Sequence, residues 1–184
     1  MSPPGRARLR IAALAVLALL VQATVAADLR VAGAAPDLLL VVGLAAAIRG
    51  GAAHGVVVGF AAGLLGDLYA SGTPVGLEAL TFCLVGYGVG ALRDNVLPAG
   101  RLLTPVLAFA ATVAAVVVFV VLGDLVGQHQ LVLAGRGALV RVTLVEAAWS
   151  ALLAVPVSWA YARAGRGSAG VDRLGGRPEV LAAR

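Results

Sequence analysis

The sequence predicts an all-α, polytopic membrane protein with six transmembrane helices. First, residues 11–161 form a near-continuous series of apolar runs. Second, 61% of the 184 residues are hydrophobic and 12% are charged, whereas soluble globular chains average about 45–50% apolar and about 25% charged residues. Third, the basic residues, all of which are arginine, cluster between alternate apolar runs. Together these observations predict a chain that crosses a bilayer repeatedly.

Six apolar runs are long enough to consider as spans, and they occupy residues 11–27, 36–48, 52–70, 75–92, 103–123 and 138–162. A transmembrane helix needs roughly 20 apolar residues, with a range of about 17–25. Five of the runs meet or approach that length. The run at 36–48 is clearly shorter than a full span requires.

The arginines orient these runs. Eleven of the fourteen fall on the side of the membrane that holds the N-terminus. They are Arg6, Arg8, Arg10, Arg49, Arg93, Arg101, Arg163, Arg166, Arg173, Arg177 and Arg184. The opposite side holds Arg30, Arg136 and Arg141. Since short cytoplasmic loops carry the excess of basic residues, both termini are expected to be cytoplasmic.

The first run has an alternative interpretation. Three arginines, an apolar stretch at 11–21 and the small residues of Val25-Ala26-Ala27 are also typical of a secretory signal peptide. If that segment were cleaved, five spans would remain and the downstream orientation would not change. We favour retention of the first span, because its apolar stretch is long for a signal peptide.

The connections divide the chain into three parts. Residues 1–10 form a basic cytoplasmic arm, residues 11–162 the membrane domain, and residues 163–184 a tail rich in arginine and glycine. The tail has few large apolar residues, so we expect it to be disordered and attracted to anionic lipid headgroups. Within the membrane domain, the short connection at 71–74 contains serine, glycine and proline, which favour a tight turn.

The third run contains a stripe of small residues. Gly55, Gly59, Gly63 and Asp67 are each four residues apart. A step of four residues advances a helix slightly beyond one turn, so these residues share one slowly winding face. Glycine on such a face lets another helix approach closely. The stripe therefore predicts a helix-packing surface that ends in a carboxylate.

The fourth run repeats this spacing with Glu78, Phe82, Gly86 and Gly90. The tight turn between the third and fourth runs forces an antiparallel helical hairpin. We expect the two stripes to pack on each other or on a common third helix.

Three carboxylates inside the apolar runs are the candidate partner or pocket residues: Asp67, Glu78 and Glu146. An aspartate at the centre of a membrane helix costs about 2.5–3.5 kcal/mol, and less near the ends. All three, together with Asp37 and Gln22, fall in the outer halves of their runs. This placement predicts a polar pocket or docking surface that opens outward. The alternative is that the carboxylates are solvated near the surface or bond to helix ends.

Other residue types give no sign of chemistry. The arginines flank spans and do not form one patch with aromatic residues, so we expect no nucleic-acid binding. Cys83 is the only cysteine, and His54 and His129 fall on opposite sides of the membrane, so they cannot share a metal ion. Ser150 and Ser158 lack a nearby histidine or acid in a nucleophile pattern. We therefore predict a protein without enzymatic activity, metal or cofactor.

Residues 36–93 contain two distinctive segments, PDLLLVVGLAAAIRG and GFAAGLLGDLYASGTPVGLEALTFCLVGYGVGALRD. These segments, with the runs at 59–67 and 76–87 as signatures, resemble the rod shape-determining protein MreD family. The resemblance implies a subunit of the bacterial cell-elongation machinery in the inner membrane. Its implied partners are the bitopic scaffold MreC, the actin-like MreB and cell-wall synthases. The implied fold is similar to the six-helix substrate-binding subunits of energy-coupling-factor transporters.

That fold similarity raises the main alternative, a small-molecule-binding subunit of a vitamin transporter. Only 5% of the residues are aromatic, which leaves few groups to stack on a vitamin ring. A third alternative is a protein that handles a lipid-linked precursor. We rank it last, because carboxylates in the outer half would repel a pyrophosphate headgroup.

Overall fold

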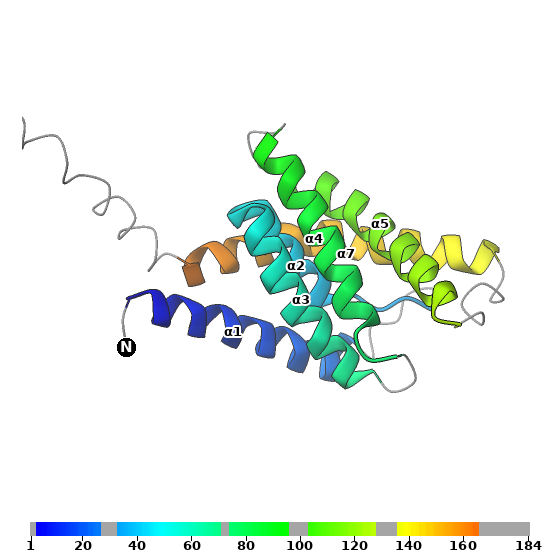
Figure 1. The fold of residues 1–184 in the computed structure, drawn as a ribbon, viewed down its shortest axis with the longest axis horizontal. Coiled ribbons are helices and arrows are strands. Elements are labelled where there is room, and N and C mark those ends of the chain that lie inside the picture. The colour runs from blue at the N-terminus through cyan, green and yellow to red at the C-terminus, as the bar shows by residue number, and fades with distance from the viewer. Residues whose placement is uncertain (1–2, 27–32, 71–73, 96–102, 128–135, 166–184) are drawn as a thin grey trace, which may run out of the picture.

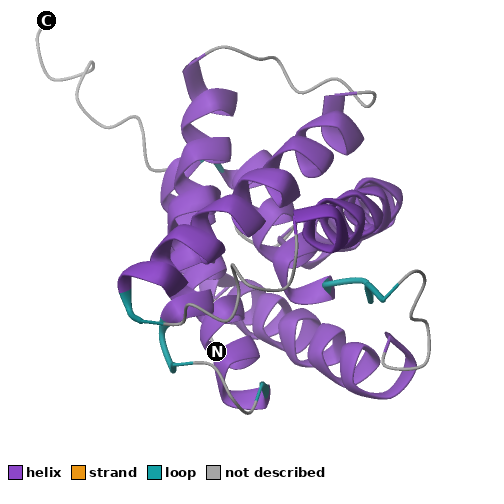
Figure 2. Ribbon diagram, turned by 90° about the vertical axis from the view of Figure 1, so that its right-hand side faces the viewer, coloured by secondary structure: helices purple, strands orange, loops and turns teal. Residues whose placement is uncertain are grey.

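The computed structural model describes residues 3–26, 33–70, 74–95, 103–127 and 136–165, which form helices joined by short connections (Figures 1 and 2). The helices are α1 (Pro3–Val21), the one-turn π-helix η1 (Gln22–Ala26), α2 (Leu38–Gly50), α3 (Ala52–Tyr69), α4 (Leu77–Asn95), α5 (Leu103–Leu125) and α7 (Arg136–Gly165). The predicted all-α architecture is confirmed, with one α-helix for each of the six apolar runs.

Three helical segments are long and apolar enough to cross a membrane: Ala52–Tyr69, Leu103–Leu125 and Gly137–Gly165. Leu9–Thr24 and Leu38–Gly50 are shorter apolar helices. These features support a multi-pass membrane protein, while the exact number of crossings stays a prediction. The first helix begins at Pro3, inside the segment expected to be only a basic arm, and the last continues to Gly165, beyond the expected end of its span.

Successive helices alternate in direction, so the start of α1 and the end of α7 lie at the same end of the bundle (Figure 1). The arginines in the last turns of α2, α4 and α7 lie at this end as well. Arg49 of α2 approaches the hydroxyl of Ser158 of α7 at 3.5 Å. The opposite end therefore corresponds to the outer side in the orientation that the arginines predict.

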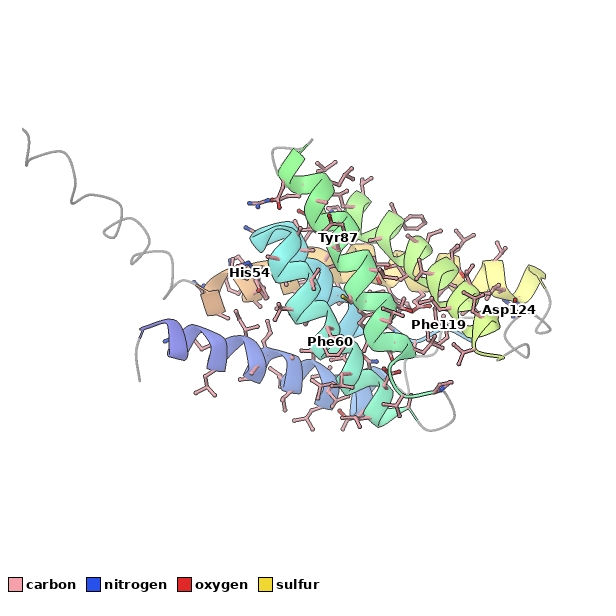
Figure 3. All side chains as sticks on the ribbon, viewed as in Figure 1. His54, Phe60, Tyr87, Phe119 and Asp124 are labelled. Carbon is pink, nitrogen blue, oxygen red and sulfur yellow. The ribbon has the colours of Figure 1, made fainter. Side chains whose placement is uncertain are left out.

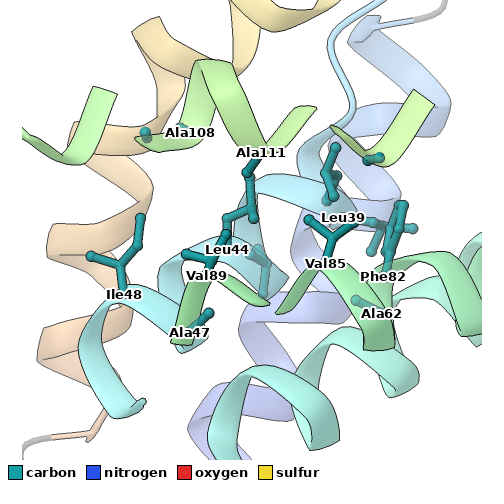
Figure 4. Close-up of a cluster of buried hydrophobic side chains, with 14 of the residues drawn as sticks. Leu39, Leu44, Ala47, Ile48, Ala62, Phe82, Val85, Val89, Ala108 and Ala111 are labelled. Atoms are coloured by element: carbon teal, nitrogen blue, oxygen red, sulfur yellow. The ribbon is translucent and has the colours of Figure 1, made fainter. Parts of the chain in front are cut away.

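Helix α2 is the centre of the bundle. Its residues 39–48 are all buried, and none of their hydrophobic side chains is more than 2% exposed. The helix packs against α3, α4, α7, α1 and α5. Figure 4 shows Leu39, Leu44, Ala47 and Ile48 of α2 in the same cluster as Phe82, Val85 and Val89 of α4 and Ala108 and Ala111 of α5. A helix that is apolar on all sides is a buried helix. Burial explains why this run is uniformly apolar although it is short for a span.

The start of α2 needs hydrogen-bond acceptors, because the first N–H groups of a helix have no partner within it. Asp37 is the N-cap, and its carboxylate accepts from the Leu40 N–H at 3.0 Å. The amide oxygen of Gln22, in η1, accepts from the N–H groups of Leu38 and Leu39 at 2.8 and 3.2 Å. Gln22, which directly follows α1, thus supplies an acceptor for two N–H groups that have no partner within α2.

Helices α3 and α4 form the predicted antiparallel hairpin, and the two glycine stripes face each other. A methyl group on Gly59 would lie 2.6 Å from the Phe82 carbonyl oxygen, and one on Gly86 would lie 2.5 Å from the Gly55 carbonyl oxygen. Added carbons on Gly63 and Gly90 would meet backbone atoms of Ala79 and Ala52 at 2.6 and 2.5 Å. The two backbones are therefore in direct contact along most of the hairpin.

We predict that Gly86→Ala lowers thermal stability in detergent, whereas Gly88→Ala on the same helix leaves it unchanged or raises it. An added carbon at Gly88 would meet nothing within 4 Å. There alanine gains up to about 1 kcal/mol of helix propensity. At Gly86 the added carbon would push the helices apart, and such overpacking costs about 1–3 kcal/mol. A melting curve of each purified variant is the measurement, and equal shifts at the two positions would contradict close packing at Gly86.

Candidate functional site

Asp67 lies near the end of α3 and caps the start of α4. The side chain is 3% exposed. Its Oδ2 accepts from the N–H groups of Gly76 and Ala79 at 2.8 and 3.0 Å, and its Oδ1 accepts from the Glu78 N–H at 3.1 Å. Three otherwise unpaired backbone donors are thereby satisfied at the buried end of a helix. This geometry matches the alternative raised from the sequence, in which the carboxylate bonds to a helix end.

A second carboxylate caps the other end of the hairpin. Asp94, in the last turn of α4, accepts from the Ala52 N–H at the start of α3 at 3.0 Å and forms an ion pair with Arg93 at 2.9 Å. It lies beyond the apolar run at 75–92. The Ala52 N–H and then the Arg93 guanidinium hold the pKa of Asp94 below its ordinary value of 3.8. Each helix of the hairpin therefore ends in a carboxylate that caps the other.

The two remaining candidate carboxylates, Glu78 and Glu146, line the same cavity of about 340 Å³. Glu78 is in the first turn of α4 and Glu146 is in α7. Asp37, the N-cap of α2, lines the cavity as well. Three acidic side chains from three helices thus meet at the outer end of the bundle.

The rest of the cavity wall is largely apolar. It includes Leu40 of α2, Phe82 of α4, and Val116, Phe119 and Val120 of α5. Figure 3 shows Phe119 on α5. A carboxylate in a largely apolar wall attracts a cation or a hydrogen-bond donor, because an unpaired charge there is costly. The cavity therefore fits a ligand or partner group that is apolar with a polar or cationic part.

Within the described residues, neither Glu78 nor Glu146 forms an ion pair with an arginine. Asp94 of the hairpin, by contrast, pairs with Arg93. The carboxylate of Glu78 lies against Gly66, where an added carbon would be 2.5 Å from Oε2. Gly66 therefore makes room for this side chain. Asp67 and Glu78 are thus neighbours with different environments: three backbone N–H groups bond to Asp67, and none of the described arginines pairs with Glu78.

Within the described residues, no group of three histidine, cysteine, aspartate or glutamate side chains is arranged to hold a metal ion. The cavity carboxylates thus share a space without forming a compact ligand set.

The sequence identified Glu78 and Glu146 as members of one outward polar region, and the structure places both at one cavity. It places Asp67 at the hairpin instead, outside the cavity wall. The sequence did not indicate that Asp94 caps α3. It indicated Asp37 only as a polar residue in the outer half of its apolar run, and not as the N-cap of α2. An aspartate directly before an apolar helical run is a typical N-cap signal and would have identified Asp37. A role of Glu78 or Glu146 in contacts with partners stays a prediction.

The fold and the cavity define a class of protein: a helical, multi-pass membrane protein with an acid-lined cavity at one end. The family model for the rod shape-determining protein MreD matches residues 7–159, and the chain belongs to this family. The resemblance found in the sequence is thereby confirmed over nearly the whole helical bundle. MreD proteins are shape-determining membrane proteins and are not a known enzyme family. No curated protein and no solved structure matches the chain.

We predict that Asp67→Leu destabilises the protein more than Asp67→Asn does. Leucine leaves three buried N–H donors without an acceptor, and each unsatisfied donor costs about 1–3 kcal/mol. Asparagine keeps one carbonyl oxygen, which serves the donors of Gly76 and Ala79, and turns an NH₂ group toward Glu78. Thermal unfolding in detergent measures the order. A larger loss for asparagine than for leucine would show that charge, and not hydrogen bonding, is what the site requires.

The lowered pKa of Asp94 makes its cap dependent on pH. A carboxyl whose pKa is lower in the folded state stabilises the fold above its ordinary pKa, and this contribution is lost as the pH falls through the lowered value. Asp94→Asn is therefore expected to melt below the wild type at about pH 7, and the difference is expected to vanish well below the ordinary value of 3.8. The two melting curves at each pH are the measurement. A difference of the same size at both pH values would argue against a charged cap.

Proposed function

We propose that this protein is a non-enzymatic integral membrane subunit of the bacterial cell-elongation machinery, which scaffolds peptidoglycan synthesis and thereby regulates cell shape. The observation that carries the proposal is the match to the MreD family across residues 7–159. The expected partners are the bitopic scaffold MreC, MreB and the cell-wall synthases that work with them. A scaffold needs binding surfaces and no catalytic group, which agrees with a sequence that lacks any nucleophile pattern.

The packing of the hairpin indicates where such binding surfaces lie. Both glycine stripes are used within the fold, because Gly59 and Gly63 contact α4 and Gly86 and Gly90 contact α3. The stripes are therefore not free to receive a partner helix. The outer cavity with Glu78 and Glu146 is the polar feature of the membrane domain that internal packing leaves open.

The proposed placement is the inner membrane, with six spans and both termini in the cytoplasm. The excess of arginine at the end of the bundle that holds Pro3 and Gly165 supports this orientation. The short α2 fits a span only as a helix enclosed by other helices. We propose that the architecture, six helices around an outward cavity, is similar to that of the substrate-binding subunits of energy-coupling-factor transporters. The tail at 163–184 lies almost entirely outside the described residues, and its disorder stays a prediction.

A pull-down in mild detergent from native membranes tests the function. We expect the tagged protein to recover the bitopic MreC-type scaffold together with cell-wall synthases, and a tagged unrelated multi-pass protein to recover neither. Recovery of paired ATPases with a transmembrane coupling subunit would overturn the proposal in favour of a transporter. Recovery of neither set by a protein that is folded and monodisperse would also count against the proposed scaffold role.

A further inference from the structure

A crevice of about 320 Å³ runs between α5 and α7 beside the acidic cavity. Its α5 wall consists of five valines: Val113, Val116, Val117, Val120 and Val121. Its α7 wall is formed by residues within 139–144. The mouth of the crevice faces outward from the bundle, since Val117 and Val121 are 56% and 54% exposed.

The spacing of these valines is that of a helix-packing face. Positions i, i+3, i+4, i+7 and i+8 form one apolar stripe on a helix. Valine has one strongly preferred side-chain conformation in a helix, so the wall is rigid and preformed. Among the described helices, α7 covers only one side of this stripe. The stripe is therefore suited to receive a second helix from the direction of the lipid.

The crevice adjoins the acidic cavity. Val116, Val120 and Leu139 line both spaces. The two spaces are therefore adjacent and share these three residues as part of their walls. Lysine and arginine extend an apolar stem with a charge at its tip, so the stem of either residue suits the apolar crevice and its charge suits the carboxylates.

The charge of the neighbouring cavity constrains what the crevice can receive. The carboxylates of Glu78 and Glu146 beside the crevice would repel the phosphate of a lipid headgroup and attract a cation. A cationic side chain carried by a transmembrane helix therefore fits this place better than a lipid headgroup.

We propose that the α5–α7 crevice receives the transmembrane helix of a partner protein, and that a lysine or arginine in the outer half of this helix reaches Glu78 and Glu146. This inference rests on the proposed scaffold function and specifies the chemistry of its partner. A charge inside the bilayer is expensive on either chain alone. Pairing offsets part of this penalty on both chains, so a helix with a cation at the right depth is selected over helices without one.

A photo-crosslinking side chain placed at position 117 tests the proposal in native membranes. Position 57 is the matched control, because Val57 is also an exposed valine, 67% accessible, but lies on α3. We expect position 117, and not position 57, to capture a protein whose captured span carries a lysine or arginine in its outer half. Capture of lipid alone at position 117 in a protein that still recovers elongation partners would overturn this inference and leave the proposed function standing.

The role of the carboxylates is tested in the same assay. Glu146→Gln, alone and combined with Glu78→Gln, is expected to reduce capture at position 117 by about tenfold or more, as for loss of a buried charge pair. Asp94→Asn, which changes a carboxylate at the other end of the bundle, should leave capture unchanged. Undiminished capture in the double variant would overturn the proposed ion pair. Exchange of the charges, with Glu146→Lys and glutamate in place of the partner's cation, should restore capture.

A second variant keeps the proposal testable if the glutamine variants do not fold. Val117→Trp fills the mouth of the crevice from an exposed position and leaves the carboxylates intact. With this variant, capture by a probe at the neighbouring position 140 is expected to fall to the level of position 57. Persistent capture of the same partner at position 140 would show that the helix binds elsewhere. If the pull-down recovers no elongation proteins at all, it is the scaffold function itself that fails.

Discussion

The constraint on which the structure depends is that every backbone N–H inside a bilayer must find an acceptor. Helix α2 is enclosed by its neighbours over residues 39–48, and the donors at its start are met by side chains. Asp37 and Gln22 supply the acceptors from the helix's own cap and from the end of the preceding segment. In the hairpin, Asp67 of α3 accepts from N–H groups at the start of α4, and Asp94 of α4 accepts from an N–H group at the start of α3. These four polar residues therefore hold the ends of helices, and their depth follows from where those ends lie.

Close backbone contact in the hairpin has a consequence for the rest of the surface. In lipid, helices associate through packing and hydrogen bonds, because the lipid tails are as apolar as the side chains. The glycine stripes of α3 and α4 pack against each other within the chain, and α2 packs against the inward faces of the surrounding helices. Helix α5 packs less extensively on the hairpin than α3 and α4 pack on each other. The space left beside it is where the acidic cavity and the valine crevice form.

The sequence predicted much of this arrangement and missed the rest for physical reasons. Hydropathy located all six helices, and the four-residue spacing of Gly55, Gly59 and Gly63 indicated the packing face of the hairpin. Helix ends were less accurate, since the arginines before residue 11 continue the first helix. The contact of Asp94 with Ala52 joins residues 42 positions apart, and no local pattern specifies it. The meeting of Asp37, Glu78 and Glu146 depends on how three helices pack, which spacing along one helix cannot reveal.

The buried carboxylates of this protein differ in their hydrogen bonding more than in their depth. Asp67 is the more deeply buried residue, yet three N–H groups of its own chain account for both of its oxygens. Glu78 is its neighbour across the hairpin, and Glu146 lies on another helix, and neither forms an ion pair within the described residues. A carboxylate in an apolar wall is costly unless it is paired, so the two glutamates differ from Asp67 in having no partner that the described residues supply. Asp67 therefore serves the fold, whereas Glu78 and Glu146 are the groups on which the proposed binding rests.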